Sequence, residues 1–386
     1  MFRHFIFSSL LLAINALCIS CQQSTKGTKH DIKVEFSKSY SIQKASQLFD
    51  REYKLIQLDA PTNQSVIKRV ERILFAGDNI IVVDRLGNKL LLFDKTGKFI
   101  TSTSDLIGRG HNEYIRLLDA ALDEKGQRIY VYCDAPYQIM VFDYNLNLID
   151  CTSLDFLAFE IAVDSTYVYL TRYDESGERK FDLVAIDKEN LQMTPHLICK
   201  GVQGVRGLNG IGKSLNISNG YVYFNVPFKY DIYKIKGAQI IETFAMNFGD
   251  KEVTDIETKE LRPSEFISEY PKHIWSLQNF CVTDSVIMYR ANTPHYFFIN
   301  TKNNECIVYD EILNDVLPIF NSMTIPTQGK KGAIVYEARP ELIERFLNHM
   351  KDDNHSKSYD SKMELVKNYT LASNPLIIEW KLKNTL

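Results

Sequence analysis

The chain has 386 residues, 45% of them hydrophobic, and a net charge of −3. This length suits two ordinary domains or one large repeat array with a sizeable core. The weakly acidic charge excludes a strong basic field for nucleic acid, and the 22 Phe and 21 Tyr against 2 Trp favour β-sheets over helices.

The N-terminal residues predict export. A basic start precedes an apolar run to about Ile19, which is interrupted by polar residues and followed by no second span, so residues 1–20 are predicted to be a signal peptide. The small Ser20 before Cys21 resembles a bacterial lipobox, although Cys18 stands where leucine is usual. We therefore expect lipidation at Cys21, with plain cleavage near Ser20 as the alternative.

Residues 21–31 are mostly polar and are expected to form a tether, so that acyl chains hold the protein at a membrane. Two short strands are predicted next, one over 32–36 and another over Tyr53–Leu58. Between 70 and 132 the sequence then repeats one unit. Apolar runs separated by Gly, Asn and Asp turns indicate a four-stranded antiparallel meander, and the same pattern restarts at Leu117.

Six such units can be followed by their third strands. The third strands end at Asp94, Asp143, Asp187, Lys236, Thr301 and Leu382. Their spacing predicts an all-β fold, a six-bladed β-propeller over residues 32–386. The last strand, LIIEWKL, is expected to pair with Tyr53–Leu58, so that N- and C-terminal strands close one blade.

Short insertions interrupt the later units. Asp250–His273 has little strand pattern and is predicted to be a loop or short helix over one face. Pro340–Met350 places apolar residues at helical spacing after an N-terminal proline, which predicts a helix. Lys362–Tyr369 is expected to add a second helical turn.

Three features besides the blades resemble a known family. They are the lipoprotein-like leader, the segment Ile107–Tyr114 (IGRGHNEY) and the closing Asn374–Ile378 (NPLII), and they are similar to the six-bladed β-propeller lipoproteins of Bacteroidota. That family usually has Gly-Arg-Gly-Pro-Gly-Glu-Tyr, whereas this chain has His111-Asn112 in place of Pro-Gly. The resemblance implies an exported, membrane-anchored propeller from a family that mostly lacks a defined biochemical activity.

The segment Gly207–Ser214 satisfies G-x-x-x-x-G-K-[ST], the phosphate-binding P-loop pattern. A P-loop needs a helix directly after it, whereas Leu215–Tyr223 has the pattern of strand, turn and strand. We therefore predict a glycine-rich connection between the third and fourth blades, and no nucleotide partner.

The segment Gly108–Tyr114 supplies the candidate ligand-binding residues Arg109, His111 and Glu113, three polar side chains beside glycines. The alternative is a turn between blades in which the glycines adopt positive φ and Arg109 or Glu113 ties neighbouring strands together. The sequence favours the structural role and leaves ligand binding open.

Propeller enzymes commonly hold a metal ion in the central channel through oxygens from several innermost strands. In this chain those strands supply Asp119, Glu160, Asn216 and Asn279 as candidate calcium ligands. A register error of one residue would turn any of these side chains to the other face. No other cofactor is indicated.

Other catalytic patterns are missing from the sequence. It has no G-x-S-x-G or H-x-x-x-H pattern, and the five cysteines beyond Cys21 are widely spaced, which argues against a disulfide framework or a zinc site. Paired tyrosines recur in second strands, where packing between blades is favoured over a sugar-stacking surface. They are Tyr130, Tyr132, Tyr167, Tyr169, Tyr221 and Tyr223.

The sequence thus favours a non-catalytic binding or assembly protein that holds a protein or glycan partner. The alternative is a metal-dependent lyase or lactonase-like hydrolase with its site in the central channel. Export and the lipid anchor predict the cell envelope. No acidic cluster follows Cys21, which favours the periplasmic face of the outer membrane over the cell surface.

Overall fold

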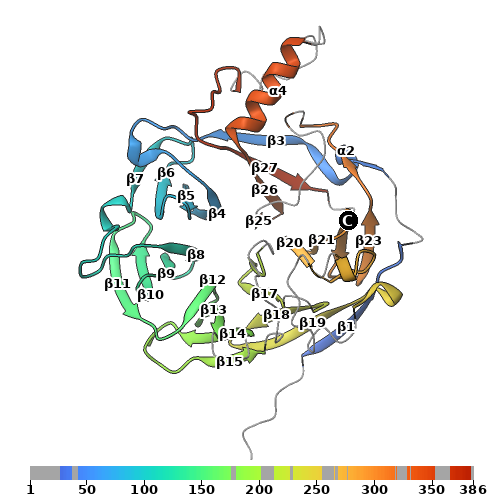
Figure 1. Ribbon diagram of the computed structural model, residues 1–386, viewed down its shortest axis with the longest axis horizontal. Helices are drawn as coiled ribbons and strands as arrows, with labels where there is room; N and C mark the ends of the chain where they lie inside the picture. Colours follow the sequence, from blue (N-terminus) through green and yellow to red (C-terminus); the bar gives the residue numbers. More distant parts are fainter. Residues whose placement is uncertain are drawn as a thin grey trace, which may run out of the picture.

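Six antiparallel β-sheets surround a central axis, which confirms the predicted six-bladed β-propeller (Figure 1). The computed structural model describes residues 27–36, 42–174, 180–200, 213–226, 229–253, 265, 268–275, 277–317, 319, 328–330, 332–352 and 366–383. The predicted signal peptide, Cys21 and most of the glycine-rich segment at Gly207 lie outside these ranges.

The first three blades each consist of four consecutive strands, which follow one another from the axis outward. Blade 1 contains β4 (Val70–Ala76), β5 (Asn79–Asp84), β6 (Lys89–Phe93) and β7 (Phe99–Ser102). Blade 2 contains β8 (Leu117–Asp123), β9 (Arg128–Asp134), β10 (Tyr137–Asp143) and β11 (Leu148–Ser153). Blade 3 contains β12 (Leu157–Val163), β13 (Tyr167–Asp174), β14 (Lys180–Asp187) and β15 (His196–Cys199).

The other three blades differ at their outer strands. Blade 4 contains β16 (Leu215–Ser218), β17 (Tyr221–Asn225), β18 (Asp231–Lys236), β19 (Gln239–Asn247) and a fifth strand, β1 (Thr28–Lys33). Blade 5 contains β20 (Leu277–Val282), β21 (Val286–Ala291), β22 (Tyr296–Asn300) and β23 (Glu305–Tyr309). Blade 6 contains β25 (Gln328–Lys330), β26 (Ala333–Ala338), β27 (Leu376–Leu382) and β3 (Phe49–Gln57).

The core lies between the blades, because their sheets pack face to face and bury both sides of the inner strands. All five residues of β6, KLLLF, are buried for this reason. Among the paired tyrosines, Tyr132 and Tyr169 are fully buried and Tyr130 and Tyr223 nearly so, which confirms their predicted packing role. The turn Asn219-Gly220 joins β16 to β17 with positive φ at both residues, as two-residue hairpins prefer.

Both ends of the chain close blade 6, as predicted. β27 pairs antiparallel with β3, and Leu376 lies opposite Gln57 and Trp380 opposite Tyr53. The indole N–H of Trp380 donates a hydrogen bond to the Asp50 carbonyl oxygen at 2.6 Å. The six third strands identified in the sequence are β6, β10, β14, β18, β22 and β27, each third from the axis.

The N-terminal strand begins earlier than expected. β1 starts at Thr28, so residues 28–31, predicted to belong to the tether, lie in a strand. β1 ends at Lys33 rather than continuing to Phe36 as the sequence suggested. The sequence predicts no pairing partner for this strand, and in the structure it extends blade 4.

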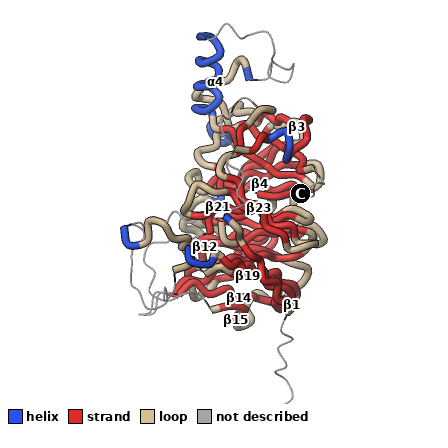
Figure 2. The backbone as a smooth tube through the Cα atoms, turned by 90° about the vertical axis from the view of Figure 1, so that its right-hand side faces the viewer, coloured by secondary structure: helices blue, strands red, loops and turns tan. Residues whose placement is uncertain are grey.

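Short elements complete the described part of the chain. They are β2 (Gln43–Lys44) paired with β24 (Ile312–Leu313), the helices α2 (Ala45–Leu48) and α4 (Pro340–Asp352), and the 3-10 turns η2 (Asn63–Ser65), η3 (Ser104–Leu106) and η4 (Gly249–Lys251). The helix predicted at Pro340 is confirmed, and Figure 2 shows it projecting from the ring. No helix in the described ranges is both long and apolar enough to cross a membrane.

The two faces of the ring differ in the length of their connections. The turn face carries the turns from first to second strands, which are short in every blade: 77–78, 124–127, 164–166, 219–220, 283–285 and 331–332. The loop face is the one at which the innermost strands begin. It receives the long connections 103–116, 200–214, 248–276, 310–327 and 339–375, the last of which contains α4.

Candidate functional site at the axis

Four innermost strands contain a β-bulge near the loop face. In β4, Val70 pairs with Asp84 and Arg72 with Val83, so one extra residue is inserted between consecutive partners. Bulges of the same kind interrupt β8, β12 and β20. The bulged pairs are Glu71-Arg72, Leu118-Asp119, Phe159-Glu160 and Asn279-Phe280.

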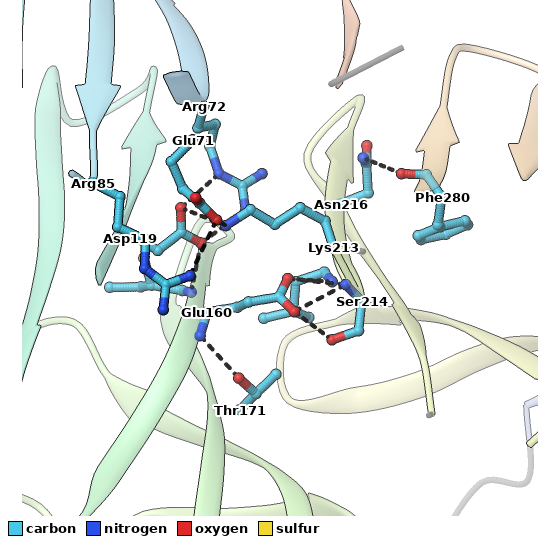
Figure 3. Close-up of polar contacts among 12 residues, drawn as sticks. Glu71, Arg72, Arg85, Asp119, Glu160, Thr171, Lys213, Ser214, Asn216 and Phe280 are labelled. Atoms are coloured by element: carbon cyan, nitrogen blue, oxygen red, sulfur yellow. Dashed lines mark hydrogen bonds and ion pairs between the residues drawn. The ribbon is translucent and has the colours of Figure 1, made fainter. Parts of the chain in front are cut away.

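A bulge breaks the strict alternation of side chains along a strand and re-aims them. Glu71 and Arg72 are consecutive residues, yet both reach the same polar cluster near the axis (Figure 3). We call this group the axial polar cluster. It consists of Glu71, Arg72, Arg85, Asp119, Glu160, Lys213 and Ser214.

Asp119 and Arg72 form the buried ion pair of the cluster. The Nε and Nη2 atoms of Arg72 donate hydrogen bonds of 3.0 and 2.8 Å to the two carboxylate oxygens of Asp119. The Asp119 side chain is fully buried and that of Arg72 is only 7% exposed. Burial by itself raises the pKa of Asp119, but the charges of Arg72 and Lys213 and two hydrogen bonds outweigh it and lower that pKa to about 2.

Lys213 connects blade 4 to blades 1 and 2. Its ammonium lies 2.9 Å from Oε1 of Glu71 and 3.2 Å from Oδ1 of Asp119, and its side chain is 16% exposed. Arg85 also approaches Oε1 of Glu71, at 3.7 Å. Lys213 is the lysine of the P-loop pattern, but strand β16 follows it rather than a helix, as predicted.

Glu160 accepts hydrogen bonds from the chain that enters blade 4. Its carboxylate accepts the backbone N–H of Ser214 and of Leu215 at 2.9 Å each, and the Ser214 hydroxyl at 2.7 Å. Its own backbone N–H donates to the Thr171 hydroxyl at 2.9 Å, which satisfies the amide at the bulge. Glu160 therefore fixes the start of β16 against blade 3.

The polar links run from blade to blade around the axis. Arg72 of blade 1 binds Asp119 of blade 2, and Asp119 Oδ2 accepts the backbone N–H of Ile161 in blade 3 at 3.2 Å. Farther round, the Asn216 amide donates to the Phe280 carbonyl oxygen at 3.3 Å and joins blade 4 to blade 5. The axial polar cluster is thus also a set of ties between blades (Figure 3).

These contacts bear on the predicted metal ligands. The carboxylate oxygens of Asp119 are held by Arg72 and Lys213, and those of Glu160 by backbone N–H groups, so both acids are already charge-compensated or hydrogen-bonded. Within the described ranges no three His, Cys, Asp or Glu side chains are grouped to hold a metal ion. The side chain of Asn279 lies outside the description, and a calcium site stays a prediction.

A further carboxyl group lies near the cluster on β26. Glu337 is 19% exposed at its side chain, its Oε2 atom has no hydrogen-bond partner, and Arg339 is 3.9 Å from its Oε1 atom. Burial raises the pKa of Glu337 to about 7, assisted by the charges of Glu71 and Glu341 and opposed by Arg339 and Arg69. This group titrates near neutral pH.

The loop Gly108–Tyr114 has a different internal structure from the one expected. Glu113 Oε2 accepts the backbone N–H of Gly110 at 2.6 Å, and a Cβ on Gly108 would lie 2.0 Å from that carboxylate. Gly108 and Gly110 do not have positive φ; Asn112 does, at 62°. The glycines leave room for the Glu113 carboxylate beside the backbone, and a positive φ is not what they provide.

Arg109 and His111 are exposed on this loop. They stand on the loop face, between blades 1 and 2, whereas Asp119 and Glu160 are near the axis. The structure therefore separates the predicted ligand-binding residues from the predicted metal ligands. Their ligand-binding role stays a prediction.

Sequence reasoning identified Asp119, Glu160 and Asn216 but missed Arg72 and Glu337. The sequence does contain a signal for Arg72. The charged residues Glu71 and Arg72 directly precede the apolar run of β4, and Asp119 lies at a similar place near the start of β8. No such signal exists for Glu337, because some of the charged residues around it come from distant segments of the chain. The five described cysteines are free thiols, two of them fully buried.

Comparisons with known proteins agree with the fold. A family profile described as "Domain of unknown function (DUF4934)" matches residues 28–381. The crystal structure of a protein described as exported, from Bacteroides fragilis NCTC 9343, is similar with a TM-score of 0.66 and 15% identity, covering 92% of this chain and 100% of that one. BamB from Moraxella catarrhalis aligns with a TM-score of 0.42 and 10% identity over 73% of this chain and 72% of that one. No curated protein matches the sequence.

Proposed function

Because this chain belongs to the DUF4934 family, whose profile spans nearly all of the propeller, we propose that it is an exported, lipid-anchored protein of the cell envelope that binds a protein or glycan partner without catalysing a reaction. The partner would be held at the loop face. The resemblance to Bacteroidota propeller lipoproteins supports the lipid anchor at Cys21, and the lack of an acidic cluster after Cys21 supports the periplasmic side of the outer membrane. The B. fragilis protein that shares the fold is described as exported.

The asymmetry between the two faces is the observation that carries the binding role. The turns from first to second strands have two to four residues, whereas five connections on the loop face have fourteen residues or more. Loops that a rigid scaffold positions are where binding residues concentrate. Arg109 and His111 are exposed on that face and are available to a partner.

The contacts of Asp119 and Glu160 favour a structural role over catalysis for these two acids. A general base needs a pKa near the working pH, whereas the pKa of Asp119 is lowered to about 2 and its oxygens are held by Arg72 and Lys213. Glu160 is likewise committed to backbone N–H groups. The two carboxylates predicted as metal ligands therefore tie neighbouring blades together.

The binding role can be tested by site-specific photo-crosslinking in cells. A photoreactive amino acid replaces Arg109 or His111 on the loop face, and in the control it replaces Glu124 or Lys125, which are exposed on the turn face of the adjoining blade. We expect discrete crosslinked species from the loop-face positions only. Equal crosslinking from both faces, or none from the loop face combined with a negative glycan array, would contradict the proposal.

The alternative, a metal-dependent lyase or lactonase-like hydrolase, rests on oxygens grouped near the axis. Calorimetric titration with calcium tests it directly. Binding heat that Asp119→Asn abolishes would favour the enzyme. If no heat is observed, calcium does not bind and the metal-dependent alternative fails.

A further inference from the structure

The N-terminal strand is fixed to the rim of blade 4. β1 runs parallel to β19, from Thr28 opposite Glu242 to Lys33 opposite Asn247, and it is the outermost strand there. Ile32 is fully buried and Val34 is 7% exposed, both in the apolar core between blades 4 and 5. Figure 1 shows β1 on the periphery of the ring.

Side chains on and after β1 reinforce this attachment. The His30 ring stacks on Phe244 at 5.2 Å, while its Nε2 lies 3.2 Å from Glu242 Oε2 and its Nδ1 lies 3.1 Å from the Asn304 amide. Farther along, the Phe36 ring packs 5.3 Å from that of His295, and Lys251 lies over it at 3.7 Å. The strand is therefore held at both of its ends.

The chain leaves the rim at Gly27. A Cβ at this position would lie 2.5 Å from the Ile240 carbonyl oxygen and 2.6 Å from that of Ile241, so the backbone is pressed against β19 up to this residue. Only five residues separate Gly27 from Cys21. Six steps of extended chain reach about 20 Å, whereas a folded chain of this length spans about 50 Å.

We infer that the propeller stands edge-on at the bilayer, with the rim formed by β1 and blade 4 facing the lipid and blade 1 pointing away. This inference rests on the proposed anchor at Cys21. A tether shorter than half the ring cannot let the protein tumble freely, so it keeps the β1 rim near the membrane. Both faces of the ring then stand clear of the membrane, and the loop face is open to a partner that lies beside the protein in the same membrane.

Surface chemistry is consistent with this orientation. Lys236 and Lys302 are exposed in turns of blades 4 and 5 where the turn face meets the rim, close to the start of β1, and their ammonium groups would meet anionic lipid headgroups there. The turn face, which could otherwise lie flat, offers mixed charges rather than a basic or apolar patch: its turns include Asp78, Glu124, Lys125 and Asp284.

The orientation can be measured by energy transfer in the full-length, acylated protein. A fluorescent amino acid is placed at Asp31 on β1 or at Lys95 in blade 1, two positions with side chains 83% and 66% exposed. The protein is reconstituted into phosphatidylethanolamine and phosphatidylglycerol vesicles that contain a headgroup-linked acceptor. We expect transfer about threefold or more higher from Asp31, because the ring of about 50 Å separates the two positions.

Two variants keep the possible outcomes distinguishable. Cys21→Ser removes the anchor, and if the acylated protein and this variant bind vesicles equally, the proposed anchor is wrong. If the acylated protein binds but both labels transfer equally, the anchor stands and the edge-on orientation is wrong. Insertion of a flexible Gly/Ser segment between Lys26 and Gly27 should narrow the difference between the labels; a difference that survives it would show that the short tether is not the cause.

Discussion

Arg72 and Asp119 form a buried ion pair, so the loss of either side chain is expected to lower the free energy of unfolding. The pair is desolvated, and removing the guanidinium would leave the Asp119 carboxylate with Lys213 as its remaining cation. We expect Arg72→Ala to lower the free energy of unfolding by about 3–5 kcal/mol, as measured by urea denaturation.

The matched control is Arg85, a cation of the same cluster whose side chain is 37% exposed. Arg85→Ala should cost at most about 1 kcal/mol, because a half-exposed ion pair is screened by solvent. Replacing Arg72 and Asp119 together by leucine should restore much of the loss. If the two arginine variants are equally stable, the pair does not tie blade 1 to blade 2.

Glu337 predicts how stability depends on pH. Its pKa is raised from 4.5 to about 7 in the folded protein, so the folded state binds more protons than the unfolded state between those values. Stability from this group is therefore fully present below about pH 4.5 and is lost as the pH rises through 7. Glu337→Gln removes this titration.

Thermal denaturation of both proteins between pH 5 and 8 measures the effect. The wild type should lose roughly 2 kcal/mol relative to Glu337→Gln over this range. Glu344→Gln, which removes a carboxyl group of α4 whose charge is not among those that shift the pKa of Glu337, serves as the control and should follow the wild-type profile. Parallel profiles for the wild type and Glu337→Gln would show that the carboxyl group is not perturbed.

The identity of polar residues near the axis could be predicted from the sequence, but their roles could not. Asp119 and Glu160 stand out because they interrupt apolar strands. Their partners depend on bulges, which shift the register by one residue and leave no clear mark in the local sequence. The metal hypothesis treated these acids as free ligands, whereas neighbouring blades supply cations and N–H groups to them.

Among the elements, β1 and β3 are both N-terminal outer strands with different consequences for the fold. β3 completes blade 6 by pairing with β27, whereas β1 is a fifth strand on a blade that already has four. A chain that begins at Ile42 should still fold, with a melting temperature lower by about 5 °C because the apolar contacts of Ile32 and Val34 are lost.

A chain that begins at Asp59 is the comparison, because it lacks β3 as well. It should show no cooperative thermal transition by circular dichroism, since β27 and Trp380 would lose the strand that covers them. Equal melting temperatures for the two shortened chains would mean that β3 does not close the ring.

Elements were the most predictable level of this structure. Apolar runs between Gly, Asn and Asp turns located all six third strands, and helical spacing located α4. The strand with which β1 pairs could not be predicted, because a short strand of alternating apolar and charged residues can pair with any open sheet edge. Blade 4 provides that edge through Phe244 and Glu242, which lie more than two hundred residues away.

The ring as a whole should unfold as a single unit. Both chain ends meet in blade 6, and the ties from Arg72 to Phe280 connect five successive innermost strands. The two tryptophans provide local reporters, since Trp275 packs in the apolar core between blades 3 and 4 and Trp380 lies in blade 6. The variants Trp275→Phe and Trp380→Phe each leave one reporter.

We expect the two single-tryptophan proteins to show the same urea midpoint by fluorescence and by circular dichroism. Far-ultraviolet circular dichroism of each variant controls for a change in stability caused by the substitution itself. Fluorescence midpoints that differ from the circular dichroism midpoint of the same protein would indicate that blade 6 opens separately from the rest.

The repeated bulges allow side chains at the centre of the ring to vary without a change in the strand pairing of the blades. A bulge residue is left out of the regular ladder, so its side chain can change while the hydrogen bonds on either side keep the strand in place. Positions 71, 118 and 159 are such sites at one level of three successive blades. The axis is therefore suited to the design of new binding surfaces, in which the side chains at these bulge positions are varied together while the six sheets stay the same. Arg72 and Asp119 would have to be replaced as a pair.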